Sequence, residues 1–134
     1  MQTSMIWGNL AVEDIKRTKS FYEQLGFQSN GYDEVENLAS FKFGDNQFVI
    51  NFFKTDRLAS SMNGNVSSTK DGNEVIFSLA AKNNEEVDQW AELVKSSGGS
   101  LNMGPKIDEN GFYVCVFADP DGHKFNIVCM DKRM

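Results

Sequence analysis

Histidine and cysteine, the side chains that most often act as metal ligands and nucleophiles, are scarce in this sequence. Its 134 residues include one histidine, His123, and two cysteines, Cys115 and Cys129. A single histidine remote from a nucleophile does not make a Ser–His–Asp or Cys–His arrangement, and the spacing of the cysteines fits no metal motif. We therefore expect two reduced, buried thiols, with His123 in a turn or at the start of a strand.

Basic charge and long apolar runs are also lacking. The formal net charge is −6, which argues against a nucleic-acid or anionic-membrane partner because both require a basic face. No apolar run approaches the roughly 18 residues of a membrane span. The N-terminus shows neither the basic start nor the apolar segment of a signal peptide. These absences lead us to expect a cytoplasmic protein that binds neither nucleic acid nor membrane.

Enough apolar residues are present for a packed core. Hydrophobic residues make up 40% of the chain, which favours one folded domain over residues 1–134. In the first half, a β-like run at 5–12 precedes a helical pattern that Asp14 can cap and Gly26 can end. The stretches LASFKFG and NQFVINFFK then predict two strands joined by a turn at 44–46.

The second half follows the same order of elements. The stretch EVIFSLAAK predicts a strand, and a helix follows that Asn83 can cap and Gly98 can end. A strand hairpin around the DPDG turn closes the chain. Asn51 and Asn126 also recur about half a chain apart. The sequence therefore predicts an α+β fold of two βαβββ modules, residues 5–53 and 74–129.

The connection between the modules, residues 55–73, is rich in Ser, Asn and Gly. Connections of this length are usually lids or linkers. We expect a polar loop that is the most mobile internal segment of the chain, either a lid or a tether.

Two segments, NLAVEDIKRTKSFYEQLGF and FADPDGHKFNIV, resemble the signatures of the vicinal oxygen chelate (VOC) superfamily. This superfamily includes glyoxalase I, the bleomycin-resistance proteins and the extradiol dioxygenases. The resemblance implies two modules that form a curved, cavity-lining mixed sheet. In the metalloenzymes four His, Glu or Gln side chains, two from each module, hold a divalent metal that polarises substrate oxygens.

Those four ligand positions fall on Trp7, Asn51, Ile76 and Asn126 in this sequence. Trp and Ile offer no metal-binding side chain, and neutral Asn oxygens are weak ligands for transition metals. The resemblance thus implies no metal and no other cofactor at this site, and it disfavours glyoxalase I activity. A register slip of two would replace Ile76 by Glu74, so a metal-dependent enzyme using Glu74 remains the alternative.

Because strand side chains alternate between faces, each position implies neighbours in the same lining. The predicted ligand-binding residues combine aromatic surface, amides and a hydroxyl: Trp7, Asn9, Asn51, Phe53, Ser78 and Asn126. Such a lining suits a small organic ligand held by stacking and hydrogen bonds. Alternatively, these side chains pack against each other or a partner chain and the pocket is vestigial.

A homodimer is the expected assembly. An open sheet of eight strands leaves free edges and apolar surface, which proteins usually cover or pair. Members of the superfamily commonly dimerise, some of them completing the cavity across subunits.

Overall fold

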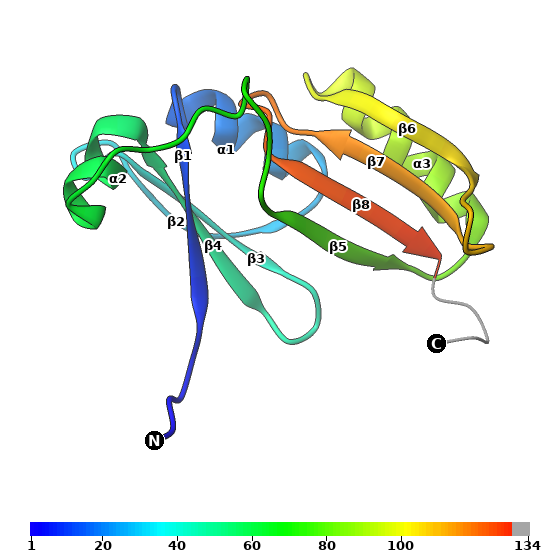
Figure 1. Cartoon of the computed structure of the whole chain (residues 1–134), viewed down its shortest axis with the longest axis horizontal. Coiled ribbons are helices and arrows are strands. Elements are labelled where there is room, and N and C mark those ends of the chain that lie inside the picture. The colour runs from blue at the N-terminus through cyan, green and yellow to red at the C-terminus, as the bar shows by residue number, and fades with distance from the viewer. Residues whose placement is uncertain (130–134) are drawn as a thin grey trace. The chain divides into compact units, whose positions relative to one another are not determined.

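The chain, described over residues 1–129 by a computed structural model, forms two compact units that divide after Ser67 (Figure 1). The first unit contains β1 (Trp7–Val12), α1 (Ile15–Gln24), β2 (Gln28–Asp33), β3 (Leu38–Phe43), β4 (Phe48–Lys54) and α2 (Thr55–Met62). The second unit contains β5 (Ile76–Ala81), α3 (Asn84–Ser96), β6 (Ser100–Ile107), β7 (Tyr113–Ala118) and β8 (Lys124–Cys129).

Each unit is one mixed four-stranded sheet. The strand order is β1-β4-β3-β2 in the first unit and β5-β8-β7-β6 in the second. In both units the first strand pairs in parallel with the last, and the remaining pairs are antiparallel. This repeated topology confirms the predicted α+β fold of two βαβββ modules. No described helix is long and apolar enough to cross a membrane.

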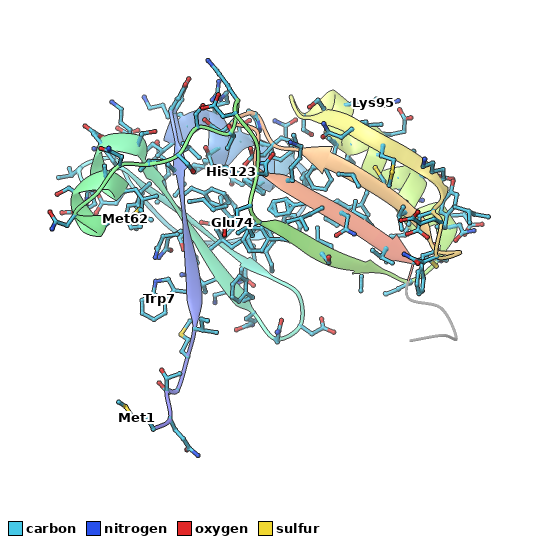
Figure 2. The ribbon with its side chains drawn as sticks, viewed as in Figure 1. Met1, Trp7, Met62, Glu74, Lys95 and His123 are labelled. Carbon is cyan, nitrogen blue, oxygen red and sulfur yellow. The ribbon has the colours of Figure 1, made fainter. Side chains whose placement is uncertain are left out.

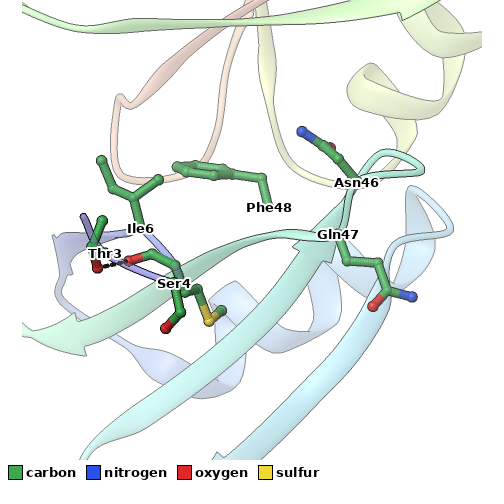
Figure 3. A pocket seen from close by; sticks show the side chains of 7 residues that line it. Thr3, Ser4, Ile6, Asn46, Gln47 and Phe48 are labelled. Carbon is green, nitrogen blue, oxygen red and sulfur yellow. Dashed lines mark hydrogen bonds between the residues drawn. The ribbon is translucent and has the colours of Figure 1, made fainter.

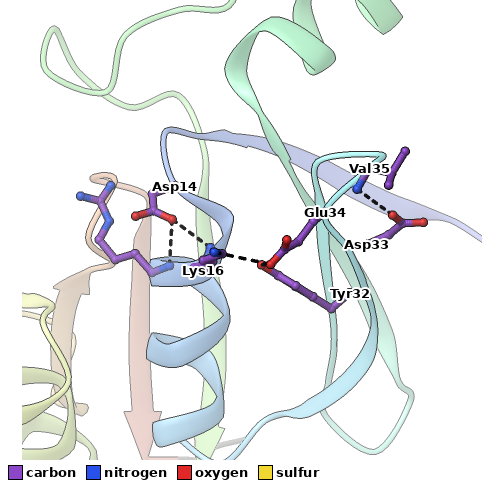
Figure 4. Close-up of polar contacts among 7 residues, drawn as sticks. Asp14, Lys16, Tyr32, Asp33, Glu34 and Val35 are labelled. Atoms are coloured by element: carbon purple, nitrogen blue, oxygen red, sulfur yellow. Dashed lines mark hydrogen bonds and ion pairs between the residues drawn. The ribbon is translucent and has the colours of Figure 1, made fainter.

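Helices α1 and α3 begin and end where the sequence predicts. Asp14 Oδ1 accepts from the backbone N–H groups of Lys16 at 3.0 Å and Arg17 at 3.2 Å (Figure 4). Gly26 follows the end of α1 with a φ of +93°, a conformation that suits a residue without Cβ. At α3, Asn83 Oδ1 accepts from Glu86 N at 2.8 Å. These caps satisfy backbone donors that helix starts leave unpaired.

An aromatic cluster forms the core of the first unit, between α1 and its sheet. Tyr22 is fully buried and its ring stacks on Phe52, with 4.6 Å between centroids. Phe41 and Phe43 are also buried, and Phe27 packs 4.4 Å from Phe43. Burying aromatic rings of this size supplies much of a small core's stability.

In the second unit α3 packs on one face of its sheet. Val87, Ala91 and Val94 of α3 are buried. Beneath the helix the rings of Phe117 and Phe125 stack at 5.2 Å. Cys115 and Cys129 are free, buried thiols in adjacent parts of this core, as predicted, and burial raises the pKa of Cys115. Both cysteines therefore pack as small apolar side chains.

The prediction of a polar loop over residues 55–73 is wrong for its first part. Residues 55–62 form helix α2, whose Leu58 is buried. The end of the segment is also anchored, because Thr69 Oγ1 donates to the backbone oxygen of Asp121, and Asn73 Nδ2 donates to that of Gly122. The apolar residues of the segment appear sparse in sequence, but helical periodicity brings Leu58 onto the side of α2 that faces β1 and β4. Asn63 N and Gly64 N still donate to carbonyl groups of α2, so we now expect mobility only in residues 65–68.

Strand boundaries also differ from the sequence pattern. The first strand of each unit begins two residues later than predicted, at Trp7 and Ile76. The pattern does not locate β2 and β6, whose sequences QSNGYD and SLNMGPKI contain glycine or proline and few alternating apolar residues. Both strands pair through irregular registers, which explains why simple alternation fails there.

Candidate functional site

The sheet of the first unit has a face opposite α1, here called the first open face. It carries, among others, Trp7 and Asn9 on β1 and Asn51 and Phe53 on β4, because the neighbours Ile50 and Phe52 are buried toward α1. Trp7 lies near the start of β1 (Figure 2), and half of its surface is exposed. The four residues that the sequence assigns to this unit thus share one face of one sheet.

A row of polar side chains crosses the first open face from strand to strand. Asn9 on β1, Asn51 on β4 and Ser40 on β3 lie opposite one another in the register. Asn30 Nδ2 donates to Ser40 Oγ at 3.1 Å, and Ser40 Oγ donates to Asn51 Oδ1 at 2.6 Å. Asn51 Nδ2 donates to Asn9 Oδ1 at 3.3 Å. The row therefore links all four strands.

The lengths of these bonds indicate the direction in which the protons are donated. A separation of 2.6 Å between Ser40 and Asn51 fits O–H···O, whereas N–H···O bonds are usually longer. Because the Ser40 hydroxyl gives its proton to Asn51, it must accept from Asn30. The amide of Asn51 then donates onward to Asn9. Every donor points the same way, and the Nδ2 group of Asn9 ends the row as a donor.

Helix α2 contributes a cation beside this face. The guanidinium of Arg57 lies over the Phe53 ring, 5.2 Å from its centroid, a cation–π geometry. Arg57 also forms an ion pair with Glu36 at 3.8 Å. The sequence analysis missed Arg57 because it placed residue 57 in a loop rather than in a helix that follows β4 directly.

The second unit has a corresponding face opposite α3, here called the second open face. It carries Ile76 and Ser78 on β5 and Lys124 and Asn126 on β8, paired as Ile76 with Lys124 and Ser78 with Asn126. Ser78 Oγ donates to Asn126 Oδ1 at 2.5 Å. The buried neighbours Phe125 and Ile127 point to the other side of the sheet, toward the core.

Lys124 is held by the end of the connecting segment. Its Nζ donates to Asn73 Oδ1 at 2.6 Å, and Asn73 Nδ2 donates to the Gly122 backbone oxygen at 2.9 Å. The turn between β7 and β8 is closed by the buried Asp119, whose Oδ1 accepts from His123 N at 2.9 Å. His123 therefore lies in the turn before β8, as predicted.

The donor set at the four positions that the sequence resemblance implies, Trp7, Asn51, Ile76 and Asn126, does not fit a metal. Trp7 and Ile76 offer no ligand, and the Oδ1 atoms of Asn51 and Asn126 each already accept a serine hydroxyl. Glu74 lies before β5 and is exposed. Among residues 1–129 no group of three or more His, Cys, Asp or Glu could hold a metal ion. The residues present therefore do not match the metal site that the superfamily's enzymes build.

A separate shallow hollow of about 480 Å³ lies where the N-terminal segment passes the β3–β4 turn. Figure 3 shows the side chains that line it, among them Ile6 and Phe48. The predicted ligand-binding residues do not line this hollow: its lining is Thr3, Ser4, Met5, Ile6, Asn46, Gln47 and Phe48. Its polar and apolar groups show no convergence of charged or nucleophilic side chains.

Some residues of the two faces escaped the sequence analysis. Ser40 could have been found by counting outward from the turn, since Phe43 pairs with Phe48 and three further steps bring Ser40 opposite Asn51. Asn30 lies beside a register shift, and Asn73 lies in the connecting segment, so neither follows from strand alternation. No local sequence signal identifies these two.

Comparison with known proteins identifies the family. The chain matches the Glyoxalase/Bleomycin resistance protein/Dioxygenase superfamily over residues 5–127, and it belongs to that superfamily. Hypothetical protein SA1046 from S. aureus is 30% identical, with a TM-score of 0.85 and coverage of 96% of this chain and 95% of that one.

More distant structures share the fold. A glyoxalase-related enzyme from Fulvimarina pelagi is 19% identical, with a TM-score of 0.82 over 95% of this chain and 88% of that one. Fosfomycin resistance protein FosX from Mesorhizobium loti is 16% identical, with a TM-score of 0.70 over 99% and 97% of the two chains. A comparison with curated proteins gave no match.

Proposed function

We propose that this member of the superfamily binds a small organic ligand on its open faces. We further propose that no metal is held by Trp7, Asn51, Ile76 and Asn126, the four positions that correspond by resemblance to the metal ligands of the superfamily's enzymes. One observation carries the proposal: the amide oxygens of Asn51 and Asn126 are occupied by the hydroxyls of Ser40 and Ser78. A neutral amide oxygen is a weak ligand for a transition metal, and here one of its two lone pairs already accepts a hydrogen bond.

The chemistry of the first open face supports organic-ligand binding. Trp7 and Phe53 offer aromatic surface for stacking, with Asn9 and Asn51 between them along the strands. Aromatic walls with a few oriented polar groups are typical of small-molecule sites. The hydrogen-bonded row fixes the amides in advance, which lowers the entropy cost of binding.

Native mass spectrometry after incubation of the purified chain with cell extract tests this proposal. We expect a small organic adduct that is strongly reduced in Trp7→Ala, because that variant loses the stacking surface. Ile6→Ala is the matched control, since it removes an exposed apolar side chain next to Trp7 and outside the predicted lining. Equal adduct recovery in all three proteins would contradict a site at Trp7.

The alternative is a metal-dependent enzyme of the superfamily that uses Glu74. It requires a metal in the purified protein near one ion per chain. Glu74→Gln should then remove the metal, whereas our proposal expects Glu74→Gln to leave ligand binding unchanged.

We also propose that the two units act as one binding domain and that the chain is a homodimer. β1 and β5 each pair on one side only within their own sheets, and the residues beside or within them include the exposed Ile6 and Val75. Exposed apolar edges favour association. Sedimentation velocity is expected to show a dimer, and a monomer at high micromolar concentration would contradict it.

A further inference from the structure

The amide of Asn126 is oriented by its short bond to Ser78. At 2.5 Å the contact fits a hydroxyl donating to an oxygen, not an amide N–H donating to a hydroxyl. The Oδ1 atom of Asn126 therefore faces Ser78, and its Nδ2 group faces away from it. Nδ2 makes no hydrogen bond with the residues that the structure describes, and Asn126 is only half-buried. Two N–H donors thus remain available on this amide.

Lys124 lies two residues earlier on the same face of β8. Side chains at this spacing stand about 7 Å apart along a strand. Lys16, Lys19 and Lys95 each pair with a glutamate on the surface. Lys124 has no ion pair within residues 1–129; instead the neutral amide oxygen of Asn73 holds its ammonium group at 2.6 Å.

This arrangement positions the charge without neutralising it. Asn73 is itself fixed by its bond to the Gly122 backbone oxygen at 2.9 Å. The ammonium retains two further N–H donors. Ile76 and Ser78 lie beside Lys124 and Asn126 in the register, so no carboxylate stands opposite either residue on β5. The chain as a whole is acidic, with a net charge of −6. Within the described residues Lys124 is nevertheless a half-buried cation with no carboxylate partner, as a site for an anion requires.

We propose that Lys124 and Asn126 form an oxyanion subsite, so that the ligand of the second open face is a small organic anion bearing a carboxylate or phosphonate group. This inference deepens the proposed function and rests on it. Both residues present N–H donors, which match an anion because an anion only accepts hydrogen bonds. A ligand group that itself donates hydrogen bonds would find no acceptor at these two residues. Bonds from an ammonium to an oxyanion are shorter and stronger than those between neutral groups. The exposed Ile76 supplies apolar contact for the rest of the ligand.

A matched set of three probes tests the subsite: benzoate, phenylphosphonate and the neutral benzamide. Titrations are followed by the ¹H–¹⁵N signals of the Asn126 side-chain amide. At least one anion is expected to bind with an affinity about tenfold above that of benzamide, and its affinity should fall with added salt. The preferred anion distinguishes a carboxylate ligand from a phosphonate ligand. Equal affinities for anions and benzamide would overturn the proposal.

Two variants and one control sharpen the result, with anion affinity measured by isothermal titration calorimetry because Asn126→Asp has no side-chain amide signal. Lys124→Met keeps the aliphatic stem and should reduce anion affinity about tenfold, while Asn126→Asp replaces the donors by a carboxylate and should abolish anion binding. Lys95→Met removes a lysine charge from α3 and should change affinity less than twofold. Anion binding that survives in both site variants overturns the subsite.

The outcomes also separate this proposal from the one it rests on. If benzamide binds as well as the anions and Trp7→Ala still loses its extract adduct, the subsite fails and organic-ligand binding stands. If no probe binds and no adduct is found, both proposals fail.

Discussion

Ser78 Oγ donates to Asn126 Oδ1 at 2.5 Å, and the first unit repeats this relationship with other strands. There the hydroxyl comes from Ser40 on the antiparallel neighbour β3, whereas Ser78 comes from the parallel neighbour β5. The two units thus reach the same result differently: the asparagine on the last strand has its oxygen occupied and its N–H donors oriented. In both units this asparagine is the residue on which the sequence resemblance places a metal ligand of the superfamily's metalloenzymes.

The two serines should contribute unequally to stability. Ser40 is 2% exposed and Asn51 is half-buried, so Ser40→Ala leaves Asn51 Oδ1 without its partner in a poorly hydrated place. We expect a loss of about 1–2 kcal/mol in the free energy of unfolding. Ser78 is exposed, and Ser78→Ala should cost under about 0.5 kcal/mol because water replaces the hydroxyl. Urea denaturation measures both, and equal costs would contradict the buried row.

Gly122 and Gly98 provide a second comparison. Both have positive φ, +93° and +102°, so alanine is strained at either by about 1–2 kcal/mol. A Cβ at Gly122 would also lie 2.6 Å from Thr69 Oγ1, whereas nothing lies within 4 Å at Gly98. Gly122→Ala should therefore lower the free energy of unfolding more than Gly98→Ala does. We expect a loss of about 2–4 kcal/mol for Gly122→Ala.

Removing the clash should recover part of that difference. Adding Thr69→Gly to Gly122→Ala is expected to cost less than the sum of the two single substitutions, as a double-mutant cycle would show. If the two losses in the free energy of unfolding simply add, the side chain of Thr69 does not clash with a Cβ at residue 122.

Tyr113 gives the stability a dependence on alkaline pH. Its hydroxyl donates to Asp88 Oδ1 at 2.5 Å, and this bond, with burial as the next cause, raises the pKa of Tyr113 above its usual 10.0. A raised tyrosine pKa adds stability below pH 10, and that stability is lost as pH rises through the folded-state pKa. The stability difference between the parent and Tyr113→Phe should therefore be constant from pH 7 to 9 and shrink above about pH 10. A pH-independent difference would contradict this linkage.

Hydrogen exchange tests the connecting segment. The amides of residues 65–68 make no hydrogen bond within the described chain, whereas Gly64 N donates to Ala59 O at 3.2 Å at the end of α2. We expect fast exchange at 65–68 and slower exchange through the second half of α2. Uniform protection from 55 to 73 would contradict a mobile segment there.

The sequence predicted the fold because its local signals agree with one another. The caps at Asp14 and Asn83, the glycine after α1 and the hairpin turns all lie where the pattern places them. Helix α2 was missed because its sequence, TDRLASSM, has one strongly buried residue, Leu58. A single apolar contact gives too little periodicity to distinguish a short helix from a loop.

The faces were predictable in part. Strand alternation places Trp7, Asn9, Asn51 and Phe53 together, and likewise Ser78 and Asn126. Alternation does not show which groups bond to one another, so the row through Ser40 and the contact of Lys124 with Asn73 required coordinates. Their role in binding a ligand remains a prediction.

The most direct test of the central claim is the metal content of the purified chain, measured by inductively coupled plasma mass spectrometry after exposure to Ni, Zn, Mn and Fe and removal of the excess. Trp7 and Ile76 offer no ligand, and the neutral amide oxygens of Asn51 and Asn126 each already accept a serine hydroxyl. The account therefore predicts far less than one bound ion per chain, with organic-ligand binding unaffected by a chelator. A content near one ion per chain, removed together with ligand binding by the chelator, would contradict it.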